Sequence, residues 1–547
     1  MTGPSLRAIA VGAGLGAVLA ATAMYSGSKT SVVDAGNVPA ALLGFAIFAA
    51  SRKKPTADEG NLVQTVASSA ANMAVTGGFL GPIAAFALSG HPLAIVPATA
   101  WGAAIGALGC LLAVPLRTPF VVASALPFPS ARAVATVIDA VYARRATGGR
   151  LRVLAAGGLA AAAIAATRDQ LGWIPEVTVL PVAIAAAAEP AIAFGIGWSP
   201  LLIGVGGMLG VRMALALVIG AVAAWLVLAP LVVDAHVVAE PSYVALLGWL
   251  LWPGIGLMIG GTFAALIASW RTLRAGLREL DDVRPGRRFM IALALAALAV
   301  IGLGELALGV PPAISALALA ASAVLTAAAA RATGETDNTP AGALGGLGQI
   351  AVGAIAPGGV AAPLGAGGVI QGTAMHSSAM LGNWRTGLVL GTEPRAQLVA
   401  QLIGVAVGAV ASGAVFELIR RGYGLASEAM PSPVARSWAA TAEVVQHGVA
   451  AMPDHAPLAA VIGAATGVAL VVASRRWPQV PSPVAIGMAF LLPPYLSLTM
   501  AIGAVGFAIV GRARPAWHAT HAATLASGLI AGESLVGLIG AALGLVR

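Results

Sequence analysis

Apolar segments of roughly 20 residues, the length that crosses a bilayer as a helix, follow one another along almost the whole chain. Short polar stretches separate them, and proline or paired glycine interrupts several. We count about 16 such segments, each long enough to span the hydrocarbon core. The pattern predicts an all-α, polytopic integral membrane bundle of about 16 transmembrane segments, with broken or re-entrant helices and no sheet.

The interruptions predict where helices break. An interior proline removes a backbone hydrogen bond, and bare carbonyls at membrane depth persist only where protein or a water-filled cavity satisfies them. Half-helix N-termini would also offer free N–H groups to carboxylates. The alternative is that small residues merely let helices pack closely. The candidate breaks are Gly77-Gly78 with Pro82, Leu126–Pro129, Ile174–Glu176, Trp252–Gly254, Pro357–Gly359 and Leu492–Pro494.

Composition supports the membrane class. Of 547 residues, 59% are hydrophobic and 9% are charged, whereas soluble domains are about 25% charged. Cys110 is the one cysteine in the sequence, which excludes disulfides within the chain and cysteine-ligated clusters.

The formal charge of +9 comes from cations gathered in short loops. This is the distribution of the positive-inside rule, so it predicts neither a nucleic-acid partner nor a basic soluble domain. It places the N-terminus and the Arg-rich loop 271–288 in the cytoplasm. We interpret the first apolar run, Leu6–Tyr25, as a retained helix, because no signal-like cleavage context follows it.

The chain also repeats itself. Ser199-Pro200 recurs as Ser482-Pro483, and the same offset pairs Ile219–Val222 with Ile502–Val505. Chance similarity among Ala/Gly/Val-rich helices is the alternative, but the matches share one order. We predict two membrane halves, 1–270 and 289–547, joined by a cytoplasmic linker, 271–288. About 8 spans in each half would make the repeat parallel, a plan of secondary transporters that bind substrate where the repeats meet.

Among the segments that lie between apolar runs, 371–404 is the most polar. An ionisable side chain at the bilayer centre costs about 2.5–3.5 kcal/mol on insertion scales, so such residues face partners, water or substrate. A second polar face comes from Gln64, Thr65 and Ser68, which fall at helical spacing. We expect the substrate cavity between these segments, although polar groups also hold helices together. The predicted substrate-binding residues are Gln64, Thr65, Ser68, Gln371, Ser377, Asn383 and Arg385.

Two ionisable residues are candidates for proton coupling. His376 titrates nearest neutrality, and Glu533 lies in an otherwise apolar helix, where an ionisable group is a functional candidate by default. The structural alternative for His376 is a hydrogen-bonded side chain that joins two helices. Arg385 is expected either to bind a substrate carboxylate or to neutralise a nearby acid.

Other chemistry has little support. His518 and His521 are helical neighbours without a nearby carboxylate, so no metal site is predicted. No GxxxxGK[ST] phosphate loop is present, which argues against an ATP-driven pump. We expect no cofactor and no catalytic residues. A membrane-embedded enzyme acting on a lipid-linked substrate and a passive channel are the alternatives from other classes.

Four motifs, in one order over 61–533, resemble the oligopeptide transporter (OPT) family. Asn61–Ser69 resembles the family's NxxVQTxAS helix, and Phe128–Ala133 resembles its FPSGxA turn, with Ala131 in place of glycine. Thr386–Gly404 resembles its TGxLLGxxPRxQxxAQLIG run, and Ser527–Glu533 matches its SGLIAGE motif. The chain therefore resembles a prokaryotic OPT member related to the yellow stripe-like branch.

The resemblance implies proton-coupled uptake of small peptides, or of metal chelates as in the yellow stripe-like branch. Protons, a small peptide or chelate and membrane lipid are the implied partners, and the sequence leaves a homodimer open. The implied location is the cell inner (cytoplasmic) membrane, with many passes. One departure matters: the acidic DLMQDFK of many relatives is replaced here by Ser377–Arg385. The coupling role of those carboxylates therefore cannot be transferred to this chain.

Overall fold

The structure is a computed structural model of the full chain. The residues described are 5–33, 36–49, 55–91, 93–123, 126–142, 148–180, 194–238, 242–268, 271, 286–336, 339–356, 358–448, 450 and 452–544. Most of the predicted linker, 271–288, lies outside the described residues.

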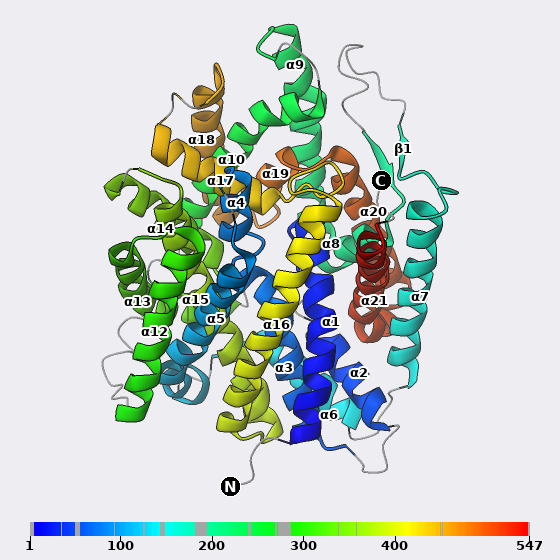
Figure 1. Ribbon diagram of the computed structural model, residues 1–547. Coiled ribbons are helices and arrows are strands. Elements are labelled where there is room, and N and C mark those ends of the chain that lie inside the picture. The colour runs from blue at the N-terminus through cyan, green and yellow to red at the C-terminus, as the bar shows by residue number, and fades with distance from the viewer. Residues whose placement is uncertain are drawn as a thin grey trace. The chain divides into compact units, whose positions relative to one another are not determined.

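Helices dominate the fold (Figure 1). Among the described residues, eleven helices are long and apolar enough to cross a bilayer. Two shorter apolar helices, α2 (Asn37–Ala49) and α14 (Ala341–Ile355), add to these. The more polar α3 (Ala57–Thr76) and α15 (Ala361–Leu390) are not among the eleven. The predicted class, a polytopic all-α membrane protein, is confirmed.

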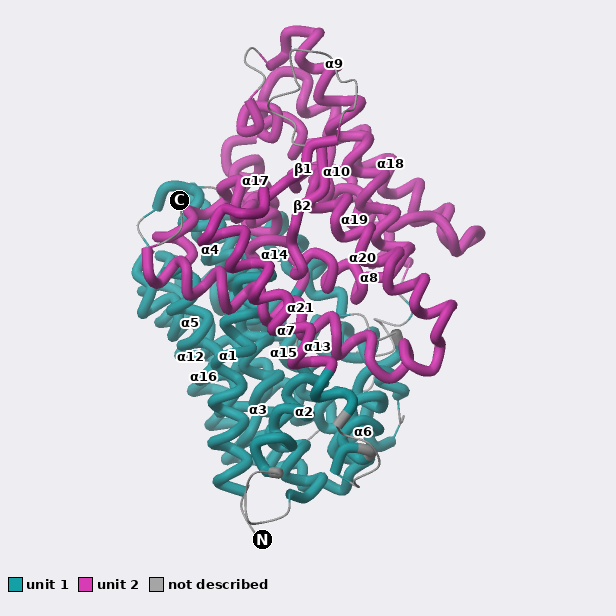
Figure 2. Tube along the Cα trace, turned by 90° about the vertical axis from the view of Figure 1, so that its right-hand side faces the viewer, with its two compact units in different colours: residues 1–27, 33–152, 269–418 teal, residues 28–32, 153–268, 419–547 magenta. Residues whose placement is uncertain are grey.

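The chain forms two compact units, which Figure 2 colours separately. Unit 1 comprises Met1–Gly27, Val33–Arg152 and Ser269–Leu418, and unit 2 comprises Ser28–Val32, Val153–Ala268 and Ile419–Arg547. Each unit therefore takes segments from both of the halves that the sequence repeat defines.

Unit 1 holds the polar segments that the sequence singles out. Its helix α15 packs on α3, α5, α13 and α14, and α12 packs on α5. Its remaining elements, two of which end just beyond the unit, are α1 (Leu6–Thr30), α4 (Pro82–Leu88), α5 (Ile95–Leu116), the π-helical η1 (Arg117–Ala123), α6 (Pro129–Tyr142), α12 (Arg287–Leu308), α13 (Pro312–Thr336) and α16 (Pro394–Gly422).

Unit 2 is built on two helix pairs, α8 with α20 and α10 with α18. Its helices are α7 (Gly148–Asp169, which begins in unit 1), α8 (Pro200–Ala221), the π-helical η2 (Val222–Leu228), α9 (Ala229–Asp234), α10 (Tyr243–Ala268), α17 (Pro433–His447), α18 (Ala456–Arg476), α19 (Pro483–Phe490), α20 (Pro494–Ala513) and α21 (Pro515–Ala542).

Unit 2 also contains a small sheet that the sequence analysis did not expect. Strands β1 (Val177–Val179) and β2 (Gly195–Gly197) pair antiparallel. A side chain at Gly195 would come within 2.5 Å of the Thr178 carbonyl oxygen, so glycine permits this pairing. The Thr499 hydroxyl accepts a hydrogen bond from Gly197 N at 2.7 Å, which fixes the strand against α20.

Most of the predicted helix breaks are present. Helix α3 ends before Gly77-Gly78 and α4 begins at Pro82, while α19 and α20 are separated before Pro494. Pro357 lies outside the described residues, between α14 and α15. The break expected at Pro253 is wrong, because α10 continues through this proline. Pro253 removes one hydrogen bond, and the close packing of α10 on α18 supports the helix around it.

Reciprocal contacts relate the repeated segments of unit 2. A side chain at Gly220 would meet the Ile486 carbonyl oxygen at 2.3 Å, and one at Gly503 would meet the Ile203 carbonyl oxygen at 2.3 Å. The sequence offset that pairs Ser199 with Ser482 also pairs Gly220 with Gly503 and Ile203 with Ile486. The two contacts are therefore equivalent. The offset also aligns Gly210, where α8 leaves helical geometry, with Pro493, which precedes α20. A local two-fold axis between two segments produces such pairs of equivalent contacts.

A second pair of contacts has the same character. Gly256 and Gly260 of α10 would place side chains 2.1 Å from the Ala460 and Ala464 carbonyl oxygens of α18. Gly528 and Gly532 of α21, which have the same four-residue spacing, would place side chains against α7 in the same way, at 2.6 Å from the Leu154 oxygen and 2.1 Å from the Gly158 oxygen. Small-xxx-small spacing permits this close approach. The division into halves 1–270 and 289–547 remains a prediction.

Cysteine labelling tests the parallel orientation of the halves, since Cys110 is buried and can be replaced by serine. In that background, Ser5→Cys and Gly286→Cys mark the starts of the two halves. Both should react with a membrane-impermeant maleimide from the cytoplasmic face, because an even number of spans separates them. Pro311→Cys, one helix after Gly286, should react from the opposite face. Labelling of Ser5→Cys and Gly286→Cys from opposite faces contradicts the parallel repeat.

Candidate functional site

Two polar helices of unit 1 form the frame of the candidate site. Helix α3 begins with a capping box, in which Thr56 and Glu59 exchange side-chain to backbone hydrogen bonds. Helix α15 ends at Leu390 and is capped by Gly391, whose left-handed φ of 77° suits glycine. Both helices are buried over most of their length despite their polar side chains.

Gln64 lies at the contact between these helices and is fully buried. Its Nε2, which carries two hydrogens, lies within hydrogen-bond distance of three acceptors: Asn383 Oδ1 of α15 at 3.1 Å, Ser68 Oγ at 3.0 Å and Asn37 Oδ1 of α2 at 2.6 Å. The structure therefore brings together three predicted site residues, Gln64, Ser68 and Asn383.

His376 lies at the same helix contact and has no exposed surface. Its Nδ1 is 3.1 Å from Thr76 Oγ1, and its Nε2 is 3.3 Å from both Ser69 Oγ and Gln401 Nε2. Gln401, from α16, also accepts a hydrogen bond from Asn383 Nδ2 at 2.7 Å. Gln401 therefore connects the surroundings of His376 to those of Gln64.

We call these side chains the α3–α15–α16 polar network. Sequence reasoning missed several members, because Thr76 and Asn37 carry no motif and Gln401 had no assigned role. Their common signal is a polar side chain in a buried helix, which requires a hydrogen-bond partner. The members are Asn37, Gln64, Ser68, Ser69, Thr76, His376, Asn383 and Gln401.

Several buried polar atoms of the same two helices lack a partner. Among the described residues, nothing lies within hydrogen-bond distance of Gln64 Oε1, Thr65 Oγ1, Gln371 Oε1 or Ser377 Oγ. An unsatisfied buried polar atom costs about 1–3 kcal/mol. Atoms of this kind are therefore candidates for contact with water or with a polar ligand.

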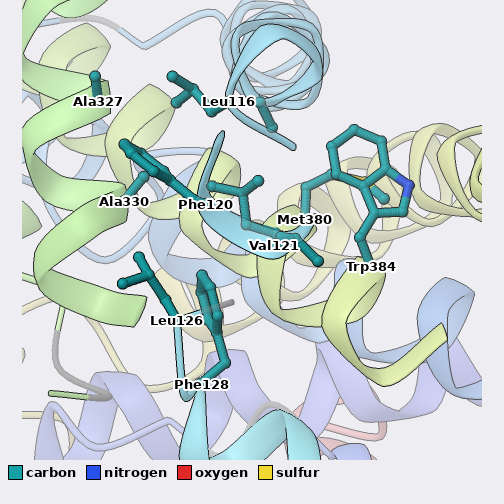
Figure 3. Close-up of a cluster of buried hydrophobic side chains, with 11 residues drawn as sticks. Leu116, Phe120, Val121, Leu126, Phe128, Ala327, Ala330, Met380 and Trp384 are labelled. Carbon is teal, nitrogen blue, oxygen red and sulfur yellow. The ribbon is translucent and has the colours of Figure 1, made fainter. Parts of the chain in front are cut away.

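Arg385 lies on a different face of α15 from Asn383. Residues two apart in a helix do not share a face, and Arg385 Nη1 instead donates to the Val121 carbonyl oxygen of η1 at 3.1 Å. Figure 3 shows Val121 beside Met380 and Trp384 in a buried apolar cluster. The structure thus does not join Arg385 to Gln64 by a hydrogen bond.

Other arginines accompany Arg385. The Arg117 guanidinium lies 6.0 Å from the centre of the Trp384 ring, and Arg132 is near enough to Arg385 to repel it. Among the described residues, Nε of both Arg117 and Arg385 has no hydrogen-bond partner. This arrangement can bind an anion, since guanidinium groups bind carboxylates in two-pronged geometry.

Glu533, the second coupling candidate, lies in unit 2 and is fully buried. Ser199 Oγ is 2.8 Å from its Oε1, and Leu201 N donates to Oε2 at 2.8 Å, so the carboxylate occupies the N-terminus of α8. Two cations lie beside the same carboxylate: Arg168 Nη2 is 3.0 Å from Glu533 Oε1, and Lys29 Nζ is 3.8 Å from it.

The sequence analysis missed the two cationic partners of Glu533. Arg168 and Lys29 are nearly as buried as Glu533, with side chains 3% and 6% exposed. They lie far from Glu533 in sequence, and cations near helix ends usually indicate a membrane boundary. A buried carboxylate requires compensating charge, and this requirement could have prompted a search for them.

Comparison with known proteins agrees with this architecture. The model of the family described as "OPT oligopeptide transporter protein" matches residues 5–543. A rice protein (Oryza sativa subsp. japonica) named "Probable metal-nicotianamine transporter YSL17" is 26% identical, over 99% of this chain and 90% of its own length. A Haemophilus influenzae protein named "Putative oligopeptide transporter" is 25% identical, over 94% of this chain and 92% of its own length.

These matches cover both units and all four motifs of the resemblance. Together with the eleven apolar helices, they identify a multi-pass membrane transport protein. The chain belongs to the OPT oligopeptide transporter family.

Proposed function

We propose that this protein is a secondary active, proton-coupled importer of small oligopeptides or peptide-like compounds across the cytoplasmic membrane. The observation that supports it best is the α3–α15–α16 polar network, a buried connection between amide side chains and a titratable histidine in a transporter-family bundle. In this proposal the protein has no enzymatic role, because translocation alone requires no bond to be broken.

The proposed substrate site lies along α3 and α15. Its unsatisfied oxygens can accept hydrogen bonds from substrate N–H groups, and its amide nitrogens can donate to carbonyl groups. A peptide offers both kinds of group at regular spacing. The proposed substrate-binding residues are Gln64, Thr65, Ser68, Gln371, Ser377, Asn383 and Arg385.

A second substrate class, an anionic metal chelate, is favoured by the arginines around Trp384. Among the described residues, Nε of both Arg117 and Arg385 lacks a partner, and Arg117 lies beside the Trp384 ring; these groups suit a bulky carboxylate-bearing ligand. The rice relative is named for a metal-nicotianamine complex. Uptake by proteoliposomes of radiolabelled tetra-alanine and of iron–nicotianamine separates the two classes.

For coupling, His376 and Glu533 would act in different ways. A proton on His376 would change the hydrogen bonds between α3, α15 and α16. A proton on Glu533 would weaken its ion pairs with Arg168 and Lys29 together with its bond to the α8 N-terminus. That change would loosen the contact of α21 with α7 and α8.

The first functional prediction concerns Glu533→Gln and His376→Gln. If either group carries the coupled proton, its variant should lose proton-driven accumulation of the transported probe and retain exchange across the membrane. Exchange does not require net proton movement, and it also reports that the variant is folded. The measurement is uptake by proteoliposomes with and without an imposed proton gradient.

Glu59→Gln is the matched control, because Glu59 is a mostly buried carboxylate that pairs with Arg7 and carries no proposed coupling role. It should accumulate the probe as the parent does. Parental accumulation by both Glu533→Gln and His376→Gln would remove both coupling candidates.

A second prediction concerns the strength of substrate binding. Arg385→Lys keeps the charge but loses the guanidinium fork, so binding of a carboxylate-bearing probe should weaken by about 1–3 kcal/mol. Gln64→Ala removes neutral hydrogen bonds and should cost about 1 kcal/mol. Calorimetric titration of the purified protein in nanodiscs measures both changes.

Ser378→Ala serves as the control for binding, since Ser378 is buried in α15 but bonds to Ala374 O of its own helix. Its affinity should match that of the parent. Unchanged affinity and transport in both Arg385→Lys and Gln64→Ala would place the site elsewhere.

A further inference from the structure

The hydrogen bonds of the α3–α15–α16 polar network have a fixed direction. When Thr76 Oγ1 donates its one hydrogen to Asn72 O, 3.0 Å away, it accepts from His376 Nδ1 at 3.1 Å. On this ground we assign the His376 proton to Nδ1. Nε2 is left as an acceptor for Gln401 Nε2.

The same direction continues away from the histidine. Because Gln401 turns its Nε2 toward His376, its Oε1 faces Asn383 and accepts from Nδ2 at 2.7 Å. Asn383 then presents Oδ1 to Gln64 Nε2 at 3.1 Å. Gln64 Oε1 is the last atom of the series, and no described residue is bonded to it.

The hydrogen-bond partners of His376 among the described residues are uncharged. Ser69 and Thr76 approach from α3, Gln401 approaches from α16, and a side chain at Gly109 of α5 would lie 2.9 Å from the His376 Cβ. Cys110, next to Gly109, is the nearest titratable side chain of α5 and is buried in an apolar cluster. Among the described residues, no ion pair involves His376. Its protonation therefore acts first on its hydrogen-bond partners.

We propose that Gln401, Asn383 and Gln64 form a relay of amide groups in which protonation of His376 reverses the hydrogen-bonding character of the substrate site. This inference deepens the proposed function and rests on it. Gln401, which has no place in the substrate or coupling assignments above, becomes the residue that connects the two.

The reversal follows from the geometry of a primary amide, which has a donor end and an acceptor end. When His376 Nε2 takes a proton from water, it becomes a donor that faces the Gln401 Nε2 donor. Ser69 Oγ, which donates to Gln401 O, can accept from the new N–H, and rotation of Gln401 to present Oε1 removes the repulsion between the two donors. The Gln401 Nε2 then faces Asn383, which must present Oδ1. This rotation turns Asn383 Nδ2 toward α3. Gln64 must then present its Oε1 to Asn383.

The consequence appears at the free end of Gln64. With neutral His376, this end is an unpartnered carbonyl oxygen that accepts from an ammonium or amide N–H. With protonated His376, it is an NH₂ group that donates to a carboxylate or carbonyl oxygen. Asn37 and Ser68 can follow the change, because an amide can rotate and a hydroxyl can donate or accept. Whether Gln64 binds the ammonium end or the carboxylate end of a peptide therefore depends on the protonation of His376.

Two probes that differ in which end is charged test the relay. Acetyl-dialanine carries a carboxylate, and dialanine amide carries an ammonium group. Binding is measured at about pH 4 and about pH 7, because a histidine buried this completely takes up a proton only in acid, and each probe keeps most of its charge at both values. For the parent protein, the ratio of affinities, acetyl-dialanine over dialanine amide, should rise about tenfold on acidification, as expected for exchanging one charged hydrogen bond.

Gln401→Glu is the decisive variant. A carboxylate accepts from His376 and from Asn383 at once, so protonation of His376 no longer rotates Asn383. The variant should bind both probes with an affinity ratio that does not change with pH. Thr392→Val removes a different buried bond of the same region, that from Asn61 Nδ2 at 3.0 Å, and should keep the tenfold change.

A second measurement needs no substrate. The side-chain amide resonances of Asn383 and Gln64, observed by ¹H–¹⁵N NMR, should shift with the titration of His376 in the parent and not in Gln401→Glu. The relay is overturned if Gln401→Glu keeps either pH response, or if the parent lacks the amide response. Absence of uptake of both peptide and chelate probes, with the amide response intact, would instead count against the proposed function alone.

Discussion

A polar side chain buried in an apolar bundle must find its partners within the protein, and this constraint explains the arrangement of both units. In unit 1, Gln64 and His376 could not be buried unless α2, α15 and α16 supplied amide and hydroxyl groups. In unit 2, the Glu533 carboxylate is buried only together with Arg168 and the N-terminus of α8. Each unit is thus organised around polar contacts between segments distant in sequence.

Glycine supplies the second requirement, which is space for helices to approach closely. The reciprocal contacts of Gly220 and Gly503 bring α8 against α19 and α20, and this packing places Ser199 and Leu201 next to α21. Bilayer lipid offers no hydrophobic gain to helix association, so close packing and hydrogen bonds have to hold the helices together. The close approach of these helices positions the polar groups.

The sequence predicts the class and the important segments well, because apolar length and motif order are local properties. It also identifies Gln64, Asn383 and His376 as polar residues in buried helices. Their partners were not predictable in the same way: Gln401 and Thr76 become relevant only through tertiary contacts. Arg385 was grouped with Asn383 by proximity in sequence, although helical periodicity turns it toward Val121. The β1–β2 pair and the continuity of α10 through Pro253 depend on packing that no local pattern records.

We propose that the substrate binds at the α3–α15–α16 polar network. The most direct test is a cryo-electron microscopy map of the protein in nanodiscs, saturated with whichever probe the uptake assay selects. We expect ligand density beside α3 and α15, within hydrogen-bond distance of Gln64. Density confined to the surroundings of Glu533 in unit 2, with the Gln64 side chain unchanged and unliganded, would contradict it.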